Sequence, residues 1–279
     1  MPSIASELSR RGGLATRSQL RVVGCSARSL RRFADDGNAR SIRRSWLATP
    51  QAEPDAVRAV ELGGILGGES ALRSFGVWVS HNTGLCVATP PGASHLPTLG
   101  DDEYRVYPHD FAWPEGKRWR TDIVSALAQL AARVEPVHFI ASVDSALNTN
   151  VMTAPQLADL FARLPRRFRR LRRLIEPRAE SGLESIVRVA AMLEGWKVEV
   201  QVAVPRVGRV DLVINGWLVI ETDGDQWHSS ATQRAKDRRR DAGLVRRGMR
   251  CHRFGYAQVM GDLDGCIEII RTLLAAGRP

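Results

Sequence analysis

Two short apolar runs joined by Asn-Gly constrain the fold of this chain more than any other feature. Residues 210–214 and 217–220 are rich in β-branched and aromatic side chains, as strands are. Asn215 and Gly216 between them favour the tight turn of a hairpin, because both tolerate the left-handed backbone that such a turn needs. The sequence therefore predicts a β-hairpin with acidic residues at its ends.

Four side chains around this hairpin carry ligand or acid–base chemistry. Asp211 lies near the start of the first strand, Glu221 and Asp223 end the second, and His228 follows five residues later. Alternation along an extended chain places Glu221 and Asp223 on the same side. Carboxylate oxygens are preferred ligands of Mg²⁺ and Mn²⁺, and a divalent cation so held can assist the hydrolysis of a phosphodiester. The alternative is a solvated acidic turn after a buried strand.

Composition sets the broad class of protein. The chain has 279 residues, of which 44% are hydrophobic and 25% are charged, as in ordinary globular proteins. No run approaches the ~18 apolar residues of a membrane span, and the first residues lack the layout of a signal peptide. The four cysteines are scattered without a CxxC pair, which argues against a zinc ribbon or a disulfide framework. We therefore expect a cytoplasmic protein with no membrane partner.

Basic residues are concentrated in two segments. The net charge of +10 favours a polyanionic partner. Residues 1–50 hold ten arginines against three acids, and residues 151–178 hold eight against two. By contrast, residues 51–150 hold seven basic and twelve acidic residues, and residues 179–279 hold fifteen and thirteen. Basic segments thus flank an acidic middle, which indicates modules with different roles.

Residues 1–50 predict a winged helix-turn-helix domain. The expected elements are three helices at residues 4–10, 17–22 and 27–35, followed by a small basic hairpin that includes a strand over 42–48. Thr16 and Ser26 are expected to cap the second and third helices. Six arginines are candidate DNA contacts, three on the third helix and three on the wing: Arg28, Arg31, Arg32, Arg40, Arg43 and Arg44. The alternative is a small helical domain with a solvated basic face.

Three further segments follow. Residues 51–162 predict a mixed α/β module without a catalytic constellation. Residues 163–178 predict a connecting helix with one apolar face and arginines, Arg170 and Arg173 among them, on the rest. That helix is either a solvated connection or a surface that follows nucleic-acid phosphates. Residues 179–279 predict the order helix, strand, strand, strand, helix, strand, helix, with Glu184 on the first helix.

The last segment resembles a known superfamily of nucleases. Glu184 on a helix, then Asp211, then Glu221-Thr-Asp223-Gly-Asp-Gln-Trp-His228 is similar to the PD-(D/E)xK superfamily, and within it to the very-short-patch-repair endonucleases and the related DUF559 proteins. The run Lys236-Asp-Arg-Arg-Arg-Asp241 extends the likeness, which covers about residues 180–270. More weakly, residues 1–150 resemble an AbiEi-type antitoxin, on Gly13-Leu-Ala-Thr-Arg-Ser-Gln-Leu20 and the wing.

The resemblance implies a fold and a set of roles. The fold class would be α/β, a restriction-endonuclease-like mixed sheet flanked by helices, preceded by a winged helix-turn-helix and a small α/β module. Asp211 would be the central metal ligand, joined by Glu221, Asp223 and the Thr222 carbonyl, with Mg²⁺ or Mn²⁺ as cofactor. Asp223 stands where most of the superfamily has lysine. His228 would then be the general base, since an imidazole has an ordinary pKa of about 6.5.

The remaining roles concern water and DNA. Glu184 would steer a water molecule or a second ion. Trp227 would act as a wedge or stack on a base. The basic residues that would hold the DNA backbone lie on the helix after the hairpin: Arg234, Lys236 and Arg238.

These patterns predict a Mg²⁺-dependent DNA endonuclease that hydrolyses phosphodiester bonds, strand nicking included, and that holds DNA through a winged helix. The alternative, from a different class, is an AbiEi-type antitoxin or transcriptional regulator whose nuclease-like domain is inactive. Cleavage of RNA is a third reading. A second copy of the chain and a cognate toxin stay open as partners, and DNA repair, phage defence and toxin–antitoxin control stay open as the setting.

Overall fold

The chain forms two compact units. The computed structural model describes residues 3–80, 84–114, 116–223 and 231–279, with the backbone alone for 231–237. The first unit comprises Met1–Gly76, His81–Arg133 and Gln156–Arg163, and the second comprises Val77–Ser80, Val134–Pro155 and Leu164–Pro279. Residues 134–155, assigned from the sequence to the middle module, thus group with the C-terminal part. Within the described residues, no helix is both long and apolar enough to cross a membrane.

The first unit begins with three helices and a three-stranded sheet. These elements are α1 (Ile4–Arg10), β1 (Leu14–Thr16), α2 (Arg17–Val22), α3 (Ala27–Asp35), β2 (Arg40–Ile42) and β3 (Trp46–Ala48), with strand order β1-β3-β2. The side chains of Thr16 and Ser26 accept hydrogen bonds from the first turns of α2 and α3, which confirms both predicted caps. The small basic hairpin is confirmed as β2–β3, but the strand expected over 42–48 is wrong because the turn divides it. Arg43 and Arg44 take positive φ angles of 44° and 59° and turn the chain between β2 and β3.

The rest of the first unit is a small mixed α/β layer. Its elements are α4 (Pro54–Glu61), β4 (Ile65–Leu66), α5 (Gly68–Ser74), β5 (Leu85–Ala88), β6 (Glu103–Val106), α6 (Ile123–Ala131) and most of α8 (Ala154–Arg163). The strand order is β4-β5-β6, with β5 antiparallel to β4 and parallel to β6. Glycine is required at position 64, because a Cβ there would lie 2.4 Å from the Ala88 carbonyl oxygen.

The second unit is built on one four-stranded sheet. Its elements are α7 (Pro136–Asn148), the 3₁₀ helix η1 (Arg166–Leu174), α9 (Gly182–Leu193), β7 (Val198–Val204), β8 (Gly208–Ile214), β9 (Leu218–Asp223), α10 (Ala231–Val245), β10 (Arg250–Gly255), α11 (Tyr256–Gly261) and α12 (Leu263–Ala275). The strand order is β10-β9-β8-β7. The predicted hairpin is confirmed as β8–β9, with Asn215 and Gly216 at φ angles of 51° and 77°. Helix α10 crosses over and lets β10 pair with β9 in parallel.

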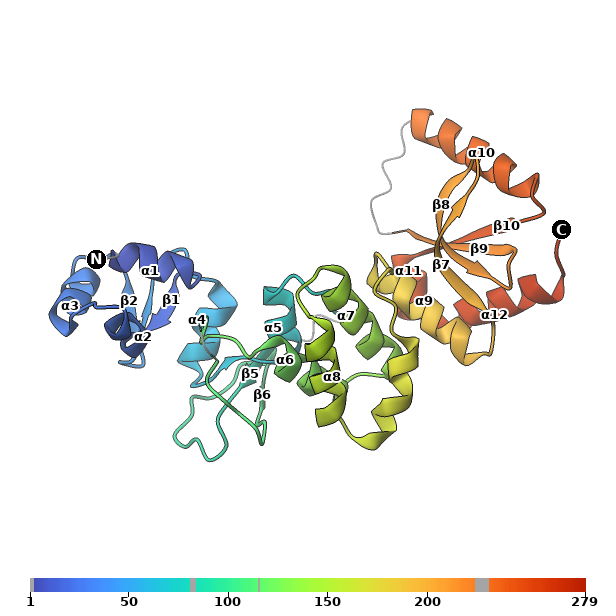
Figure 1. Ribbon diagram of the computed structural model, residues 1–279. Helices are drawn as coiled ribbons and strands as arrows, with labels where there is room; N and C mark the ends of the chain where they lie inside the picture. The colour runs from blue at the N-terminus through green and yellow to red at the C-terminus, as the bar shows by residue number, and fades with distance from the viewer. Residues whose placement is uncertain (1–2, 81–83, 115, 224–230) are drawn as a thin grey trace. The chain divides into compact units, whose positions relative to one another are not determined.

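Helices cover both faces of this sheet. One core contains side chains of α9, α11 and α12 packed on alternate strand residues, among them Leu212, Ile220 and Phe254. The other core packs Leu244 of α10 on strand residues that include Val219. Figure 1 shows α10 on one side of the strands and α9 and α12 on the other. The strands bury apolar side chains on both faces, and the acidic residues Asp211, Glu221 and Asp223 are exceptions to this pattern.

The arginine-rich segment forms a 3₁₀ helix, which corrects the predicted α-helical face. Its sequence Arg-Arg-Phe-Arg-Arg-Leu-Arg-Arg-Leu repeats every three residues, and a 3₁₀ helix has three residues per turn. Phe168, Leu171 and Leu174 are therefore all buried, and the Phe168 ring lies 5.7 Å from that of Phe139 on α7. Ile175, expected on the apolar face, is extended and follows the helix. The arginines between these residues are exposed.

A buried ion pair fixes η1 and α9 to α7. Asp144 on α7 accepts hydrogen bonds from Arg188 Nη2 at 2.7 Å and from Ser185 Oγ at 2.8 Å, both on α9. Its other carboxylate oxygen accepts from the backbone N–H of Glu176, just after η1, at 2.7 Å. The Asp144 and Arg188 side chains are only 1% and 3% exposed. Asp144 therefore fixes both η1 and α9, the helix that carries Glu184, to α7.

Candidate functional site

Glu184 is buried where α9 meets the sheet. Ser181 caps α9 and accepts a hydrogen bond from the Glu184 backbone N–H, which sets the glutamate in the first helical turn. The Glu184 carboxylate accepts from Gln201 Nε2 at 3.0 and 3.1 Å and from the Glu180 backbone N–H at 2.9 Å. Gln201, on β7, has a positive φ of 53°. That bend directs its amide towards α9.

Asp211 lies on β8 opposite Gln201. The register pairs Val200 with Leu212 and Val202 with Val210, so Gln201 and Asp211 face each other across the two strands. One carboxylate oxygen of Asp211, Oδ2, accepts a hydrogen bond from the backbone N–H of Thr222 on β9 at 3.0 Å. The hairpin thereby brings the Asp211 carboxylate next to the backbone that joins Glu221 to Asp223.

Glu221 is held by two arginines. Its carboxylate oxygens lie 2.6 Å from Arg240 Nη2 on α10 and 3.0 Å from Arg253 Nε on β10. The Arg240 approach is a charge contact rather than an aligned hydrogen bond, since Glu221 Oε1 has no hydrogen-bonded partner among the described residues. Arg253 also donates to Asp241 Oδ1 at 2.6 Å. Glu221 is therefore part of an ion-pair network across α10 and β10.

The family comparison falls on this part of the chain. Residues 184–274 match the model of the family REase_MTES_1575. The match runs from Glu184 to α12, takes in the whole sheet, and covers about a third of the chain. These residues form a restriction-endonuclease-like domain, which indicates a nuclease with DNA as its substrate. No curated protein matches the chain.

Burial and like charges raise the pKa values of the acids in the restriction-endonuclease-like domain. Burial raises the pKa of Glu184 to about 7, and the charge of Asp211 adds to the effect. Burial also raises the pKa of Asp211; the charge of Asp223 adds to this rise, while Arg240 opposes it. For Glu221 the pKa is raised by burial and held back by Arg240 and Arg253. Asp211 thus lies within electrostatic reach of Glu184, Glu221 and Asp223.

The donor set fits a divalent cation in part. Asp211 and Asp223 are hard oxygen donors whose mutual repulsion a cation would relieve, and the Thr222 carbonyl belongs to the same strand. Glu221 does not fit as it stands, because both its oxygens face guanidinium groups. Among the described residues, no three His, Cys, Asp or Glu side chains are grouped closely enough to hold one ion.

Several residues expected at this site lie outside what can be described. Trp227 and His228 fall outside the described residues. Arg234 and Lys236 lie on the backbone of α10, but their side chains are not among those described. Arg238, also on α10, is exposed.

The arginines expected to contact DNA in the first unit are all exposed. On α3, Arg28 and Arg31 are exposed beside the buried Leu30, and Arg32 lies 3.8 Å from Asp36. Arg43 and Arg44 form the tip of the β2–β3 hairpin. In that hairpin, Arg40 is bound to Glu61 at 2.7 Å. Arg32 and Arg40 thus each lie near a carboxylate, which partly neutralises their positive charge.

On the arginine-rich segment, Arg170 and Arg173 are exposed on η1. They occupy the same row of the three-residue repeat, whose third member is Arg167.

Three residues of the site were missed from the sequence. No sequence motif identified Gln201 as a site residue, because a single glutamine on a strand can have many roles. Arg240 and Arg253 were noticed as basic residues but not as partners of Glu221, from which they are separated by many residues in the chain. Contacts of this range depend on the crossover through α10 and not on any local spacing.

Proposed function

We propose that this protein is a metal-dependent DNA endonuclease. The restriction-endonuclease-like domain would cut the phosphodiester, and the arginines of the first unit would hold the duplex as a winged helix does. Mg²⁺ or Mn²⁺ is the proposed cofactor. The similarity to very-short-patch-repair and DUF559 proteins, and of the first unit to AbiEi-type antitoxins, is part of the same proposal.

One observation carries the proposal. Asp211 lies within electrostatic reach of both Glu184 and Asp223, inside the segment that matches a restriction-endonuclease-like family. Acids held this close repel one another unless a cation neutralises their charge, and such repulsion is typical of functional sites. A solvated acidic turn after the second strand, the alternative reading, would not bury Glu221 or raise its pKa.

The roles of the chain's own residues follow from these positions. Asp211 and Asp223, with the Thr222 carbonyl, would hold the cation. The cation would neutralise the phosphate and acidify the attacking water. Glu184, with its pKa raised to about 7, is suited to exchange a proton with a water molecule near neutral pH. His228 is proposed as the base that accepts the proton of that water.

A second function is favoured by a specific observation. Arg240 and Arg253 occupy both oxygens of Glu221, and Asp223 stands where most of the superfamily has lysine. A domain in which Glu221 is a structural ion-pair partner would bind DNA without cutting it. The chain would then act as a regulator of the antitoxin class.

Cleavage of supercoiled plasmid separates the two functions. The purified chain is mixed with plasmid and Mg²⁺ or Mn²⁺, and relaxed and linear products are followed on a gel. We expect nicking that is lost in a chelator. Asp211→Ala should lower the rate by about a hundredfold or more, because it removes a proposed cation ligand. Glu221→Ala should lower the rate too, because Arg240 and Arg253 then lose their carboxylate beside the site.

The control is Asp101→Ala, which removes an exposed acid from a loop of the first unit. It should cut at the wild-type rate. DNA binding without cleavage, with either metal and with both supercoiled and linear substrates, would favour the regulator. Cleavage of RNA in preference to DNA would reassign the substrate.

A further inference from the structure

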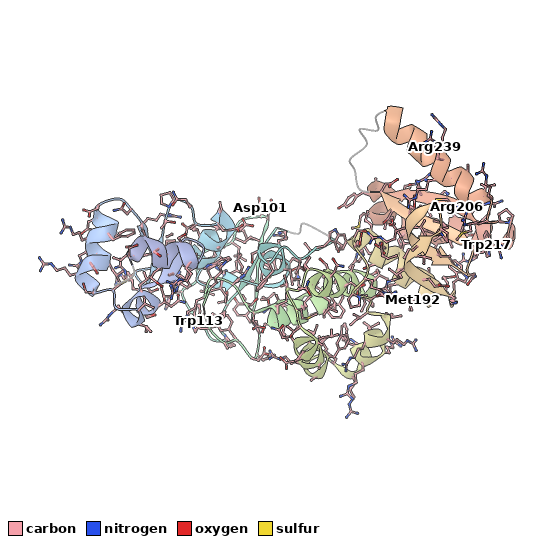
Figure 2. The ribbon with its side chains drawn as sticks, turned by 45° about the horizontal axis from the view of Figure 1, so that its top comes forward. Asp101, Trp113, Met192, Arg206, Trp217 and Arg239 are labelled. Carbon is pink, nitrogen blue, oxygen red and sulfur yellow. The ribbon has the colours of Figure 1, made fainter. Side chains whose placement is uncertain are left out.

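Four arginines line a hollow on the restriction-endonuclease-like domain. The hollow has a volume of about 350 Å³ and is lined by Arg206, Arg239, Ala242, Gly243, Arg246 and Arg247. We call it the arginine hollow. Arg206 lies in the turn between β7 and β8, and the other arginines lie on the C-terminal half of α10 and just beyond it (Figure 2).

Small residues of α10 form this hollow. Arg239, Gly243 and Arg246 are spaced four and three residues apart, so they share one face of the helix. A Cβ at position 243 would lie 2.7 Å from Cγ2 of Val207, so only glycine lets the helix approach the β7–β8 turn this closely. Ala242 adds little bulk beside it. The arginines therefore surround a space that small side chains keep open.

Arg206 occupies a backbone position that suits glycine. The Val207 N–H donates to the Val204 carbonyl at 3.0 Å, and Arg206 between them has a φ of 60°. With Pro205 before it, this is the third position of a turn in which glycine is favoured. A long cationic side chain at such a strained position indicates a role other than folding.

The charges of the hollow are uncompensated. Across the described ranges, none of its four arginines forms an ion pair with a carboxylate, and no acid lines the hollow. Two nearby arginines, by contrast, do form ion pairs. Arg209 lies 2.7 Å from Glu180, and Arg240 lies 2.6 Å from Glu221. Adjacent arginines are thus neutralised, whereas these four have no carboxylate partner among the described residues, although like charges in one hollow repel one another.

We propose that the arginine hollow binds a backbone phosphate of duplex DNA. Guanidinium groups donate forked hydrogen bonds that match phosphate oxygens, and a phosphodiester supplies the missing negative charge. Arg240 follows Arg239 on α10 and contacts Glu221, so the hollow lies on the helix that also reaches the candidate site. This inference rests on the proposed function, which supplies DNA as the ligand.

The salt dependence of DNA binding tests the hollow. The full-length chain is titrated with a duplex oligonucleotide in a chelator, at several salt concentrations. Arg206→Gly and Arg246→Gln should each flatten the slope of log affinity against log salt by about 0.9, and each should weaken binding about fivefold near 0.15 M salt. Arg206→Gly should unfold at the wild-type temperature or above, because glycine relieves the strained position. This variant therefore separates DNA contact from folding.

Arg271→Gln is the matched control, because it removes an exposed arginine already bound to Glu194 and Glu268. It should leave the slope unchanged. Wild-type slopes in both hollow variants overturn the proposal. Unchanged DNA slopes together with inorganic phosphate binding, seen by calorimetry and lost in the double variant, also overturn it and assign a small free anion instead. If the slopes fall but the wild-type chain never cuts plasmid, the hollow stands and the nuclease proposal fails.

Discussion

At the scale of single residues, Asp211 is a group whose charge works against folding. Burial raises its pKa, and the neighbouring charges of Asp223 and Glu180 add to the rise. Its ionised form is therefore unfavourable in the folded chain when no cation is present. Residues that lower the stability of the folded chain are typical of functional sites.

Replacing Asp211 by asparagine should therefore separate stability from metal binding. In a chelator, Asp211→Asn should unfold a few degrees above wild type, a gain on the order of 1 kcal/mol. A saturating divalent cation should raise the unfolding temperature of wild type, with a gain of about 2.7 kcal/mol at a hundredfold excess over Kd. The variant should not respond. Calorimetry with Asp101→Asn as control measures both effects, and an equal metal response in variant and wild type would contradict the assignment.

That Glu221 and Asp223 share one side of β9 could be predicted from the sequence, because alternation along a strand is a local property. Their partners could not be predicted. Arg253 is 32 residues from Glu221 in the chain, and only the parallel pairing of β9 with β10 brings the two together.

At the scale of elements, local signals predicted helices well and irregular backbone poorly. Thr16 and Ser26 mark the starts of α2 and α3 because capping depends on neighbouring residues alone. The turn of the hairpin formed by β2 and β3 was missed because it uses two arginines at positive φ, where glycine or asparagine is the usual signal. The short strands β1 and β4 were missed too, since their pairing partners lie far away in the chain.

The Asp144–Arg188 pair gives a prediction at this scale. Arg188→Met leaves Asp144 buried without its guanidinium, so the variant should lose about 3 kcal/mol or more of unfolding free energy at pH 7.5. Burial raises the pKa of Asp144 from 3.8 to about 6, despite Arg188. Its ionisation thus weakens the fold as pH rises through about 6, and more strongly once Arg188 is gone.

Urea unfolding at pH 7.5 and pH 5 measures this dependence. The gap between Arg188→Met and wild type should narrow at pH 5, where Asp144 is protonated in the variant. Arg178→Met, which removes an exposed partner of Glu176, should change stability by no more than about 0.5 kcal/mol at either pH. A gap of equal size at both pH values would show that lost packing, and not an unpaired charge, sets the effect.

At the scale of the whole molecule, the two units carry different parts of the proposed function. The exposed arginines of the first unit lie on α3 and on the β2–β3 turn, while the acids lie at the end of the second unit's sheet. The sequence predicted this separation from charge alone, because basic and acidic residues are unevenly distributed along the chain. It did not predict that α7 packs with the second unit, since the apolar faces of amphipathic helices do not identify their partners.

The first unit can be tested for DNA contact through its own arginines. Arg31→Ala and Arg43→Ala should each weaken duplex binding and flatten its salt slope by about 0.9, the effect of one phosphate contact. Arg40→Ala should have a smaller effect, because Glu61 already neutralises that side chain. Fluorescence anisotropy over a range of salt concentrations measures the slopes. Unchanged slopes in both Arg31→Ala and Arg43→Ala would remove DNA contact from the first unit.

The three-residue repeat of η1 makes that segment sensitive to length rather than to composition. One residue inserted after Phe168 would rotate every later side chain by a third of a turn. Arg170 and Arg173 would then occupy the buried positions that Leu171 and Leu174 fill, where the apolar surroundings disfavour charged guanidinium groups. Substitution of single arginines leaves the buried row of Phe168, Leu171 and Leu174 intact, whereas an insertion would move Leu171 and Leu174 out of their buried positions.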